Sequence, residues 1–315
     1  MMAKPNILIY LSLILVLSFV PGIMNAQYFR DQTRLLFYDS LYPTNEKAIS
    51  KGYATDELVS ISLHPEFGIP EIKVIFGSFQ TPLFFDFGNN GNILITNAIS
   101  DSVPFIIQDT IPTYTPDGQV RAIVYSIVLP EFQLLDSLFH FEPSTLADWS
   151  VFSTSPTNGI VGLKYFQQKR FTLSYRSRLL GISNTPLPDG LISVRASIFP
   201  IQVFDNHPYG VYFEAEVAGQ DVLVYFDTGK SHSQINLDLV DPSQIVSDKS
   251  GRFYADTIAI QFKNHRFEMV YPRVGTINRS TNSSLPVGME VGSDLLQHFL
   301  LTIDRTDGKN QLILH

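Results

Sequence analysis

The sequence of 315 residues contains no cysteine. This absence excludes disulfide bonds, thiolate metal ligands and a cysteine nucleophile, because each of them requires the sulfur atom of that residue. The seven histidines are scattered along the chain and never form the H-E-x-x-H pattern of a zinc-binding helix. The sequence therefore predicts no metal centre.

Basic residues are few as well. The chain has 22 Lys and Arg against 30 Asp and Glu, which gives a formal net charge of −8, and its basic residues form no cluster. Binding to a phosphate backbone needs clustered Lys and Arg, so nucleic acid is not expected as a partner. A mild negative charge of this kind is typical of a protein that stays soluble.

The lack of one motif and the scarcity of tryptophan argue against two other classes of hydrolase. The G-x-S-x-G motif of serine hydrolases is missing. Glycosidases also work with two carboxylates, but Trp149 is the single tryptophan that could stack on a sugar ring. Both classes are therefore disfavoured.

The N-terminus has the pattern of an export signal. Lys4 precedes an apolar run over residues 7–20, a Pro-Gly pair ends that run, and the small residue Ala26 follows. The run is shorter than the roughly 20 apolar residues of a membrane span. The pattern predicts a signal peptide over residues 1–26, and hence a periplasmic or extracellular protein without a membrane partner after cleavage. An uncleaved anchor is the alternative.

The remaining chain is predicted to be mostly β. Short segments rich in β-branched and aromatic residues are bounded by Gly, Pro, Asn or Asp, as in "KVIFGSF", "PLFFDF", "GNILIT", "VRAIVYSIVL", "GVYFEAEVAG" and "DVLVYFDTG". Helical periodicity is confined to "VGLKYFQQKR" and "VGSDLLQHFL".

The two halves of the chain share three patterns in the same order, which indicates an internal duplication. The matched pairs are 76–90 with 217–231, 117–137 with 250–270, and 160–175 with 290–304. Each half contains an apolar strand that runs into Asp-x-Gly, then two apolar strands, then an apolar residue, Gly and a short helical stretch. We therefore predict an N-terminal lobe over 27–184, a Pro- and Gly-containing linker over 185–190, and a C-terminal lobe over 191–315.

The duplicated Asp-x-Gly suits a pair of catalytic carboxylates. Asp227 ends an apolar strand, Thr228 offers a hydroxyl to the other half, and Gly229 allows a sharp turn. Asp86 and Gly88 occupy the same places in the first half. Two carboxylates that face each other share a proton, so one can activate water while the other protonates a carbonyl.

These residues resemble the aspartic peptidases, in particular two-lobed bacterial relatives of pepsin and the retropepsins. The resemblance rests on "VYFDTG" (224–229) with "VGSDLL" (291–296), and on "FFDFG" (84–88) with "IVGL" (160–163). It covers nearly all of the chain after the signal and implies a bilobal pepsin-like fold with a cleft between two related β lobes.

Carried onto this sequence, the resemblance implies that Asp86 and Asp227 form the catalytic dyad. It also implies supporting roles for five residues in and behind the two turns: Gly88, Thr228, Gly229, Gly162 and Gly292. The segment 113–125 would form a flap, with Tyr114 as the flap tyrosine. The implied function is that of an endopeptidase: a monomer that acts on a peptide or protein substrate without a metal or organic cofactor.

Some positions depart from the family pattern. Phe87 replaces a Thr or Ser, so half of the reciprocal hydrogen bonding between the lobes is expected to be lost, and its larger side chain is expected to push the Asp86 loop aside. Asn89 and Lys230 stand where a small residue is usual, and Glu290 replaces an apolar residue. A lysine that faced the dyad would lower its pKa. The alternative function is therefore a catalytically impaired relative that binds a peptide or protein in the cleft.

Two other interpretations fit the sequence less well. The tripeptide Asp86-Phe87-Gly88 matches the D-F-G of protein kinases, but no glycine-rich loop, β3 lysine or catalytic loop precedes it. A purely structural exported β protein leaves the shared positions of Gly88 and Gly229 without a reason. "NRS" (278–280) and "NSS" (282–284) match N-glycosylation acceptors, which matter only in a eukaryotic secretory pathway.

Overall fold

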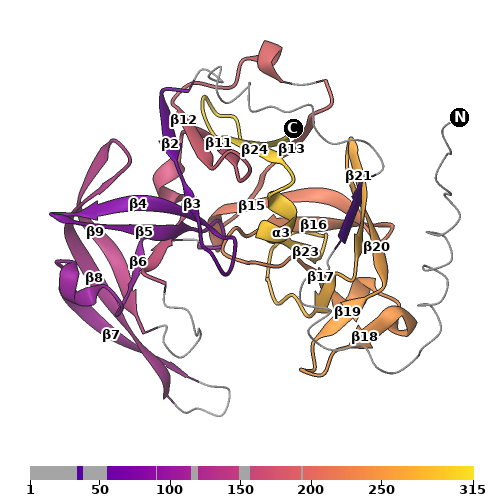
Figure 1. Ribbon diagram of the computed structural model, residues 1–315, viewed down its shortest axis with the longest axis horizontal. Helices are drawn as coiled ribbons and strands as arrows, with labels where there is room; N and C mark the ends of the chain where they lie inside the picture. The colour runs from indigo at the N-terminus through magenta and orange to yellow at the C-terminus, as the bar shows by residue number, and fades with distance from the viewer. Residues whose placement is uncertain (1–33, 38–54, 90, 115–119, 149–156, 193) are drawn as a thin grey trace, which may run out of the picture.

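The computed structural model describes residues 34–37, 55–89, 91–114, 120–148, 157–192 and 194–315. Side chains are described in these ranges except for 34–37, 113–114 and 120–122. The predicted signal peptide, 1–26, lies outside the described residues. Three β-sheets make up most of the described chain (Figure 1), which confirms the prediction of a mostly β protein.

The first half of the chain forms an eight-stranded sheet in the order β3-β4-β5-β10-β6-β9-β8-β7, on the left of Figure 1. Its strands are β3 (Ser62–Leu63), β4 (Pro70–Phe76), β5 (Phe79–Phe85), β6 (Leu94–Thr96), β7 (Ile106–Tyr114), β8 (Val120–Leu134), β9 (Ser137–Ala147) and β10 (Gly159–Val161). The buried-and-exposed alternation of β4 places one of its faces in the core and the other towards solvent.

The second half forms an eleven-stranded sheet, on the right of Figure 1. Nine of its strands are consecutive: β14 (Gln202–Phe204), β15 (His207–Val217), β16 (Gln220–Phe226), β17 (Gln234–Asn236), β18 (Ile245–Ser247), β19 (Phe253–Ala255), β20 (Thr257–Phe262), β21 (His265–Val270) and β22 (Arg273–Gly275). The other two are β23 (Val287–Val291) and β1 (Arg34–Phe37), which pairs with β21 although it comes from the first half.

A six-stranded sheet joins the halves. Its order is β13 (Ser197–Pro200), β25 (Gln311–Leu314), β24 (Leu300–Asp304), β11 (Arg170–Ser174), β12 (Leu179–Ser183) and β2 (Glu57–Ser60). The central pair, β11 and β24, comes from opposite halves, and the hydroxyls of Thr172 and Thr302 are hydrogen-bonded across it at 2.9 Å in a buried position. Since main-chain bonds cross this pair, the two halves are held by a continuous sheet.

The duplicated segments adopt the same local topology. In the first half β10 lies parallel to β5 and antiparallel to β6. In the second half β23 lies parallel to β16 and antiparallel to β17. A strand is thus inserted between two others in each half, and the residue after β5 and after β16 is an Asp of the duplicated motif. The predicted duplication therefore places both motifs in equivalent surroundings.

Helices are short in the described chain. The two segments with helical periodicity form the 3₁₀ helix η3 (Leu163–Phe166) and the α-helix α3 (Ser293–Leu296). The predicted linker runs into the 3₁₀ helix η4 (Asp189–Leu191), and η2 (Ser100–Ser102), η5 (Leu237–Leu239) and η6 (Pro242–Gln244) lie in connections. Within the described residues, no helix has the length and apolar character needed to cross a membrane.

Aromatic packing connects the shared sheet to the first Asp motif. Phe171, on β11, is 1% exposed, and its ring centroid lies 5.7 Å from that of Phe85 and 5.6 Å from that of Phe87. The six-stranded sheet therefore packs, through Phe171, against the loop that carries Asp86.

We expect Phe171→Ala to lower the free energy of unfolding by about 3–5 kcal/mol, because it removes a buried ring and leaves a cavity. Phe253→Ala is the matched control, since Phe253 is 47% exposed on β19, and should change stability by less than about 0.5 kcal/mol. Urea unfolding followed by circular dichroism measures both. Equal losses for the two variants would contradict this account of the core.

Candidate active site

Asp86 follows β5 directly, and a parallel neighbour fixes the direction of its backbone. The N–H of Asp86 donates to the carbonyl oxygen of Val161, the last residue of β10, at 2.9 Å. Its carboxylate Oδ1 accepts a hydrogen bond from the N–H of Gly88 at 2.7 Å. Strand and loop together thus hold the carboxyl group in one direction.

Asp227 is held in the same manner in the second half. Its N–H donates to the carbonyl oxygen of Val291, at the end of β23, at 2.9 Å. Its Oδ1 accepts from the N–H of Gly229 at 3.1 Å. The two loops are therefore near copies in their hydrogen bonds as well as in their sequence.

The structure brings these two side chains together, as the sequence predicts. The carboxyl groups of Asp86 and Asp227 lie side by side, because the N–H of Gly229 reaches an oxygen of each. The N–H of Gly229 also donates to Oδ1 of Asp86, at 3.2 Å. A Cβ atom on Gly88 would lie 2.4 Å from Oδ1 of Asp227, and one on Gly229 would lie 2.4 Å from Cγ of Asp86. Only glycine leaves room for the opposite carboxyl group at these positions.

Burial makes the pair difficult to ionise fully. Asp227 is 7% exposed. Burial raises its pKa well above the ordinary value, the negative charge of Asp86 raises it further, and Arg279 lowers it. Burial also raises the pKa of Asp86, against hydrogen bonds from Asp227, Gly88 and Gly229 that lower it. Like charges this close favour a state in which the pair carries one proton.

Thr228 connects the two motifs through its hydroxyl. Its Oγ1 accepts from the N–H of Phe87 at 2.9 Å and donates to the carbonyl oxygen of Phe85 at 2.5 Å. The side chain is fully buried. Thr228 thus makes two hydrogen bonds that cross between the halves.

Phe87 does not displace the Asp86 loop. Its ring is 1% exposed and packs edge-on against Phe85, with the centroids 5.1 Å apart, in the core of the first half. The carbonyl oxygen of Phe87 accepts a hydrogen bond from the hydroxyl of Tyr225 at 3.2 Å. Phe87 itself contributes no hydroxyl, but Tyr225 supplies a further bond between the halves.

Gly162 and Gly292 lie directly behind the two loops. A Cβ atom on Gly162 would lie 2.4 Å from the carbonyl oxygen of Asn89, and one on Gly292 would lie 2.8 Å from that of Lys230. The loops that carry the two Asp residues could not pack this closely against a larger residue. Both glycines therefore lie where close packing behind the Asp loops requires the smallest residue, and their supporting role in a catalytic site stays a prediction.

A charged cluster beside Asp227 was not foreseen in the sequence. Arg279 donates from Nη2 to Oδ2 of Asp227 at 3.3 Å and from Nε to Glu290. Its guanidinium carbon lies 3.8 Å from the centre of the Tyr225 ring. Lys230 forms an ion pair with Glu290. Arg279 lies in the loop between β22 and β23, where an isolated arginine has no sequence signal of a role at the dyad.

The predicted flap lies partly outside the described residues. β7 and β8 form an antiparallel hairpin with Tyr114 opposite Val120, and the hairpin projects from the eight-stranded sheet in Figure 1. Residues 115–119 and the side chain of Tyr114 lie outside the described part of the chain. Its role as a flap tyrosine stays a prediction.

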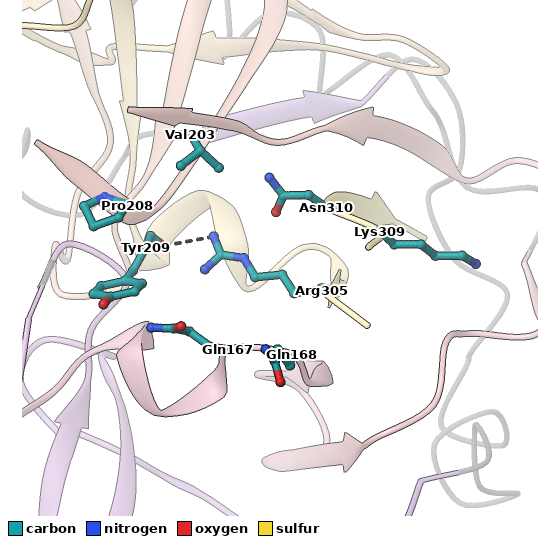
Figure 2. Close-up of a pocket in the computed structure, with 8 residues that line it drawn as sticks. All are labelled: Gln167, Gln168, Val203, Pro208, Tyr209, Arg305, Lys309 and Asn310. Atoms are coloured by element: carbon teal, nitrogen blue, oxygen red, sulfur yellow. Dashed lines mark hydrogen bonds between the residues drawn. The ribbon is translucent and has the colours of Figure 1, made fainter. Parts of the chain in front are cut away.

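A pocket of about 410 Å³ lies at a different place (Figure 2). It is lined by Gln167, Gln168, Val203, Pro208, Tyr209, Arg305, Lys309 and Asn310, and includes neither Asp of the dyad. Arg305 donates from Nη2 to the carbonyl oxygens of Tyr209 at 2.9 Å and Gly210 at 3.1 Å, so it holds the first part of β15. Among the described residues, no group of three or more His, Asp or Glu is arranged to hold a metal ion.

Thr228→Val should lower the free energy of unfolding by roughly 2 kcal/mol or more, because it leaves the N–H of Phe87 and the carbonyl of Phe85 buried without a partner. Thr228→Ser keeps the hydroxyl and should cost less than about 1 kcal/mol. Guanidinium unfolding compares the two variants. The account of Thr228 is wrong if valine and serine are equally tolerated.

The raised pKa values predict a pH-dependent effect of Asp227→Asn. A carboxyl group whose pKa is raised by folding stabilises the protein below its unfolded pKa of about 4, and this contribution is lost as the pH rises through the folded value. The variant should therefore be more stable than the wild type at pH 7, by about 1 kcal/mol or more, and similar to it near pH 3. Thermal unfolding across pH measures this difference. The exposed Asp221, on the same strand, provides the control Asp221→Asn, for which a flat difference is expected.

No known protein family and no curated protein sequence matches the chain. The chain is similar in structure to an aspartic proteinase from Irpex lacteus, known from its crystal structure. The TM-score is 0.53 at 12% sequence identity, and the match covers 82% of this chain and 97% of that chain. A likeness at this identity establishes the fold. The chain therefore has the mostly β, bilobal fold of the pepsin-like aspartic proteinases.

Proposed function

We propose that the protein is an exported aspartic endopeptidase that hydrolyses peptide bonds with water activated by Asp86 and Asp227. The observation that carries the proposal is the close approach of these two carboxyl groups between Gly88 and Gly229. A buried pair that shares a proton has both an acid and a base available at the same place. The likeness of the fold to an aspartic proteinase supports the same reaction class.

In the proposed reaction the charged carboxylate takes a proton from water as the water oxygen attacks the carbonyl carbon of the peptide. The protonated carboxyl group gives its proton to the carbonyl oxygen, so a neutral geminal diol forms. The carbon–nitrogen bond then breaks as the nitrogen receives a proton from one carboxyl group of the dyad, while a hydroxyl of the diol returns its proton to the other carboxylate. The products are a carboxylic acid and an amine, and the reaction requires no metal or organic cofactor.

The proposed substrate is an extended peptide or protein segment that lies in a cleft between the halves. The hairpin of β7 and β8 would close over it. This hairpin carries the exposed apolar side chains of Ile107, Ile111 and Ile123, which supports a preference for hydrophobic residues near the cleaved bond. The predicted export signal supports the periplasm or the outside of the cell as the proposed site of this reaction.

Binding without cleavage is the second candidate function. Arg279 contacts Asp227 directly, and Phe87 lacks the hydroxyl that the family motif has at this position. A cation that favoured full ionisation of the dyad would remove the acid that the reaction needs. The same fold would then bind a peptide without hydrolysing it.

Cleavage of a mixed library of peptides, measured by mass spectrometry between pH 3 and pH 8, tests the proposed function. Wild-type protein lacking residues 1–26 should cleave, whereas Asp86→Asn and Asp227→Asn should each lose at least about a hundredfold of the rate, because each removes one partner of the acid–base pair. Asp221→Asn should keep wild-type activity.

The outcomes separate the two candidate functions. Equal cleavage by the wild type and both dyad variants would exclude the proposed mechanism. Retention of peptides by the wild type without any cleavage at any pH would overturn the endopeptidase proposal and support the binding function.

A further inference from the structure

We propose that Arg279 is a positioning residue of the dyad, which holds Asp227 in place and favours the singly charged state of the Asp86–Asp227 pair. The expected effect on activity rests on the proposed function, but the effect on proton binding by the pair does not. The inference is drawn from the contacts of the Arg279 side chain and from the charges that surround it.

The guanidinium of Arg279 is held from three sides. Its Nη2 contacts Oδ2 of Asp227 at 3.3 Å, its Nε bonds to Glu290, and its plane covers the ring of Tyr225. Tyr225 and Glu290 are register partners on β16 and β23. Two adjacent strands of one sheet thus fix the place of the guanidinium, and its side chain is only 20% exposed.

Arg279 donates a hydrogen bond to the carboxylate oxygen of Asp227 that does not accept from Gly229. The N–H of Gly229 bonds to Oδ1 of Asp227, and Nη2 of Arg279 bonds to Oδ2. Both oxygens of this carboxyl group therefore have a donor. A carboxyl group held in this way cannot rotate without losing one of the two bonds, so Arg279 fixes its orientation towards Asp86.

The dyad and the three charged residues beside it have a net charge of zero only when the dyad carries a single negative charge. Arg279 and Lys230 each carry a positive charge, and Glu290 carries a negative one, because Lys230 and Arg279 lower its pKa by more than burial raises it. One negative charge on the pair of Asp86 and Asp227 then makes the cluster neutral. Two protons on the pair leave a net positive charge and no proton leaves a net negative charge, and either is unfavourable in a buried place.

The tyrosine hydroxyls and the histidine ring that face the cluster are neutral around neutral pH. Burial raises the pKa of Tyr175, Tyr212 and Tyr225, so their hydroxyls stay protonated. Burial and the charge of Arg279 lower the pKa of His207, whose ring lies near those of Tyr212 and Tyr225. Arg279 is thus the positive charge in direct contact with the dyad in the described part of the chain.

A merely structural role as the counter-ion of Glu290 would not require the contact with Asp227. Glu290 already has a cation in Lys230. Lys230 and Arg279 therefore serve as a natural comparison. Loss of Lys230 leaves the contact with the dyad intact, whereas loss of Arg279 removes it and leaves Glu290 paired.

The test compares Arg279→Met, Arg279→Lys and Lys230→Met with the wild type in carbon NMR titrations of ¹³C-labelled Asp carboxyl groups. Methionine removes the charge at similar length, and should raise the proton affinity of the dyad about tenfold or more, because an opposite charge in contact with a carboxylate favours its charged form. Lysine should give a smaller rise, and Lys230→Met a smaller one still. Arg252→Met, which removes an exposed positive charge on a distant turn, should leave the titration unchanged.

If the wild type cleaves peptides, both limbs of its pH–rate profile should move to higher pH in Arg279→Met. Titrations of Arg279→Met and Arg279→Lys that coincide with the wild type would overturn the role of Arg279, whether or not the protein is active. A shifted titration in a protein that never cleaves peptides would support the role of Arg279 and overturn only the proposed function. If Arg279→Met fails to fold, the other two variants test the role of Arg279. The proton affinity of the dyad should then rise more in Arg279→Lys than in Lys230→Met.

Discussion

The close approach of two carboxyl groups is the constraint on which the rest of the site depends. A methyl group on Gly88 or Gly229 would overlap the opposite carboxyl group, so each motif leaves space for the side chain of the other. Backbone N–H groups must then supply the hydrogen bonds, and the strands behind them must fix the loops. The inserted parallel strands β10 and β23 do this, because each accepts the N–H of one Asp. The duplicated topology thus follows from the need to present two carboxyl groups face to face.

The two loops that carry Asp86 and Asp227 contact the opposite half of the chain through different groups. Thr228 bonds to the backbone of Phe85 and Phe87 through its hydroxyl, whereas Phe87 turns its ring into the core of its own half. The hydroxyl of Tyr225 adds a bond to the carbonyl oxygen of Phe87. Tyr225 also supports Arg279 with its ring face. One aromatic residue therefore takes part both in the contact between the halves and in the charge cluster beside the dyad.

Much of the site could be predicted because its residues repeat in the sequence. The duplicated Asp-x-Gly and the later apolar-Gly identified the two carboxylates and four of the glycines that surround them. The expectation that Phe87 costs the site a hydroxyl was right, but its ring packs inside the first half, where no displacement of the Asp86 loop results. Lys230 stands next to the motif in sequence, yet its ammonium group pairs with Glu290. The residue that does contact Asp227 is Arg279, 52 positions away in a loop without a repeat.

The sequence by itself determined the strands, the duplication and the pair of Asp residues, because these depend on local residue patterns and on comparison of one half with the other. Only the tertiary structure decided which charges meet. The direction of a lysine or arginine side chain depends on the strands and loops that fold against it, and Arg279 reaches Asp227 because β23 brings Glu290 beside Tyr225. Long-range charge contacts of this kind leave no periodic trace in a sequence, since they join residues whose separation along the chain is arbitrary.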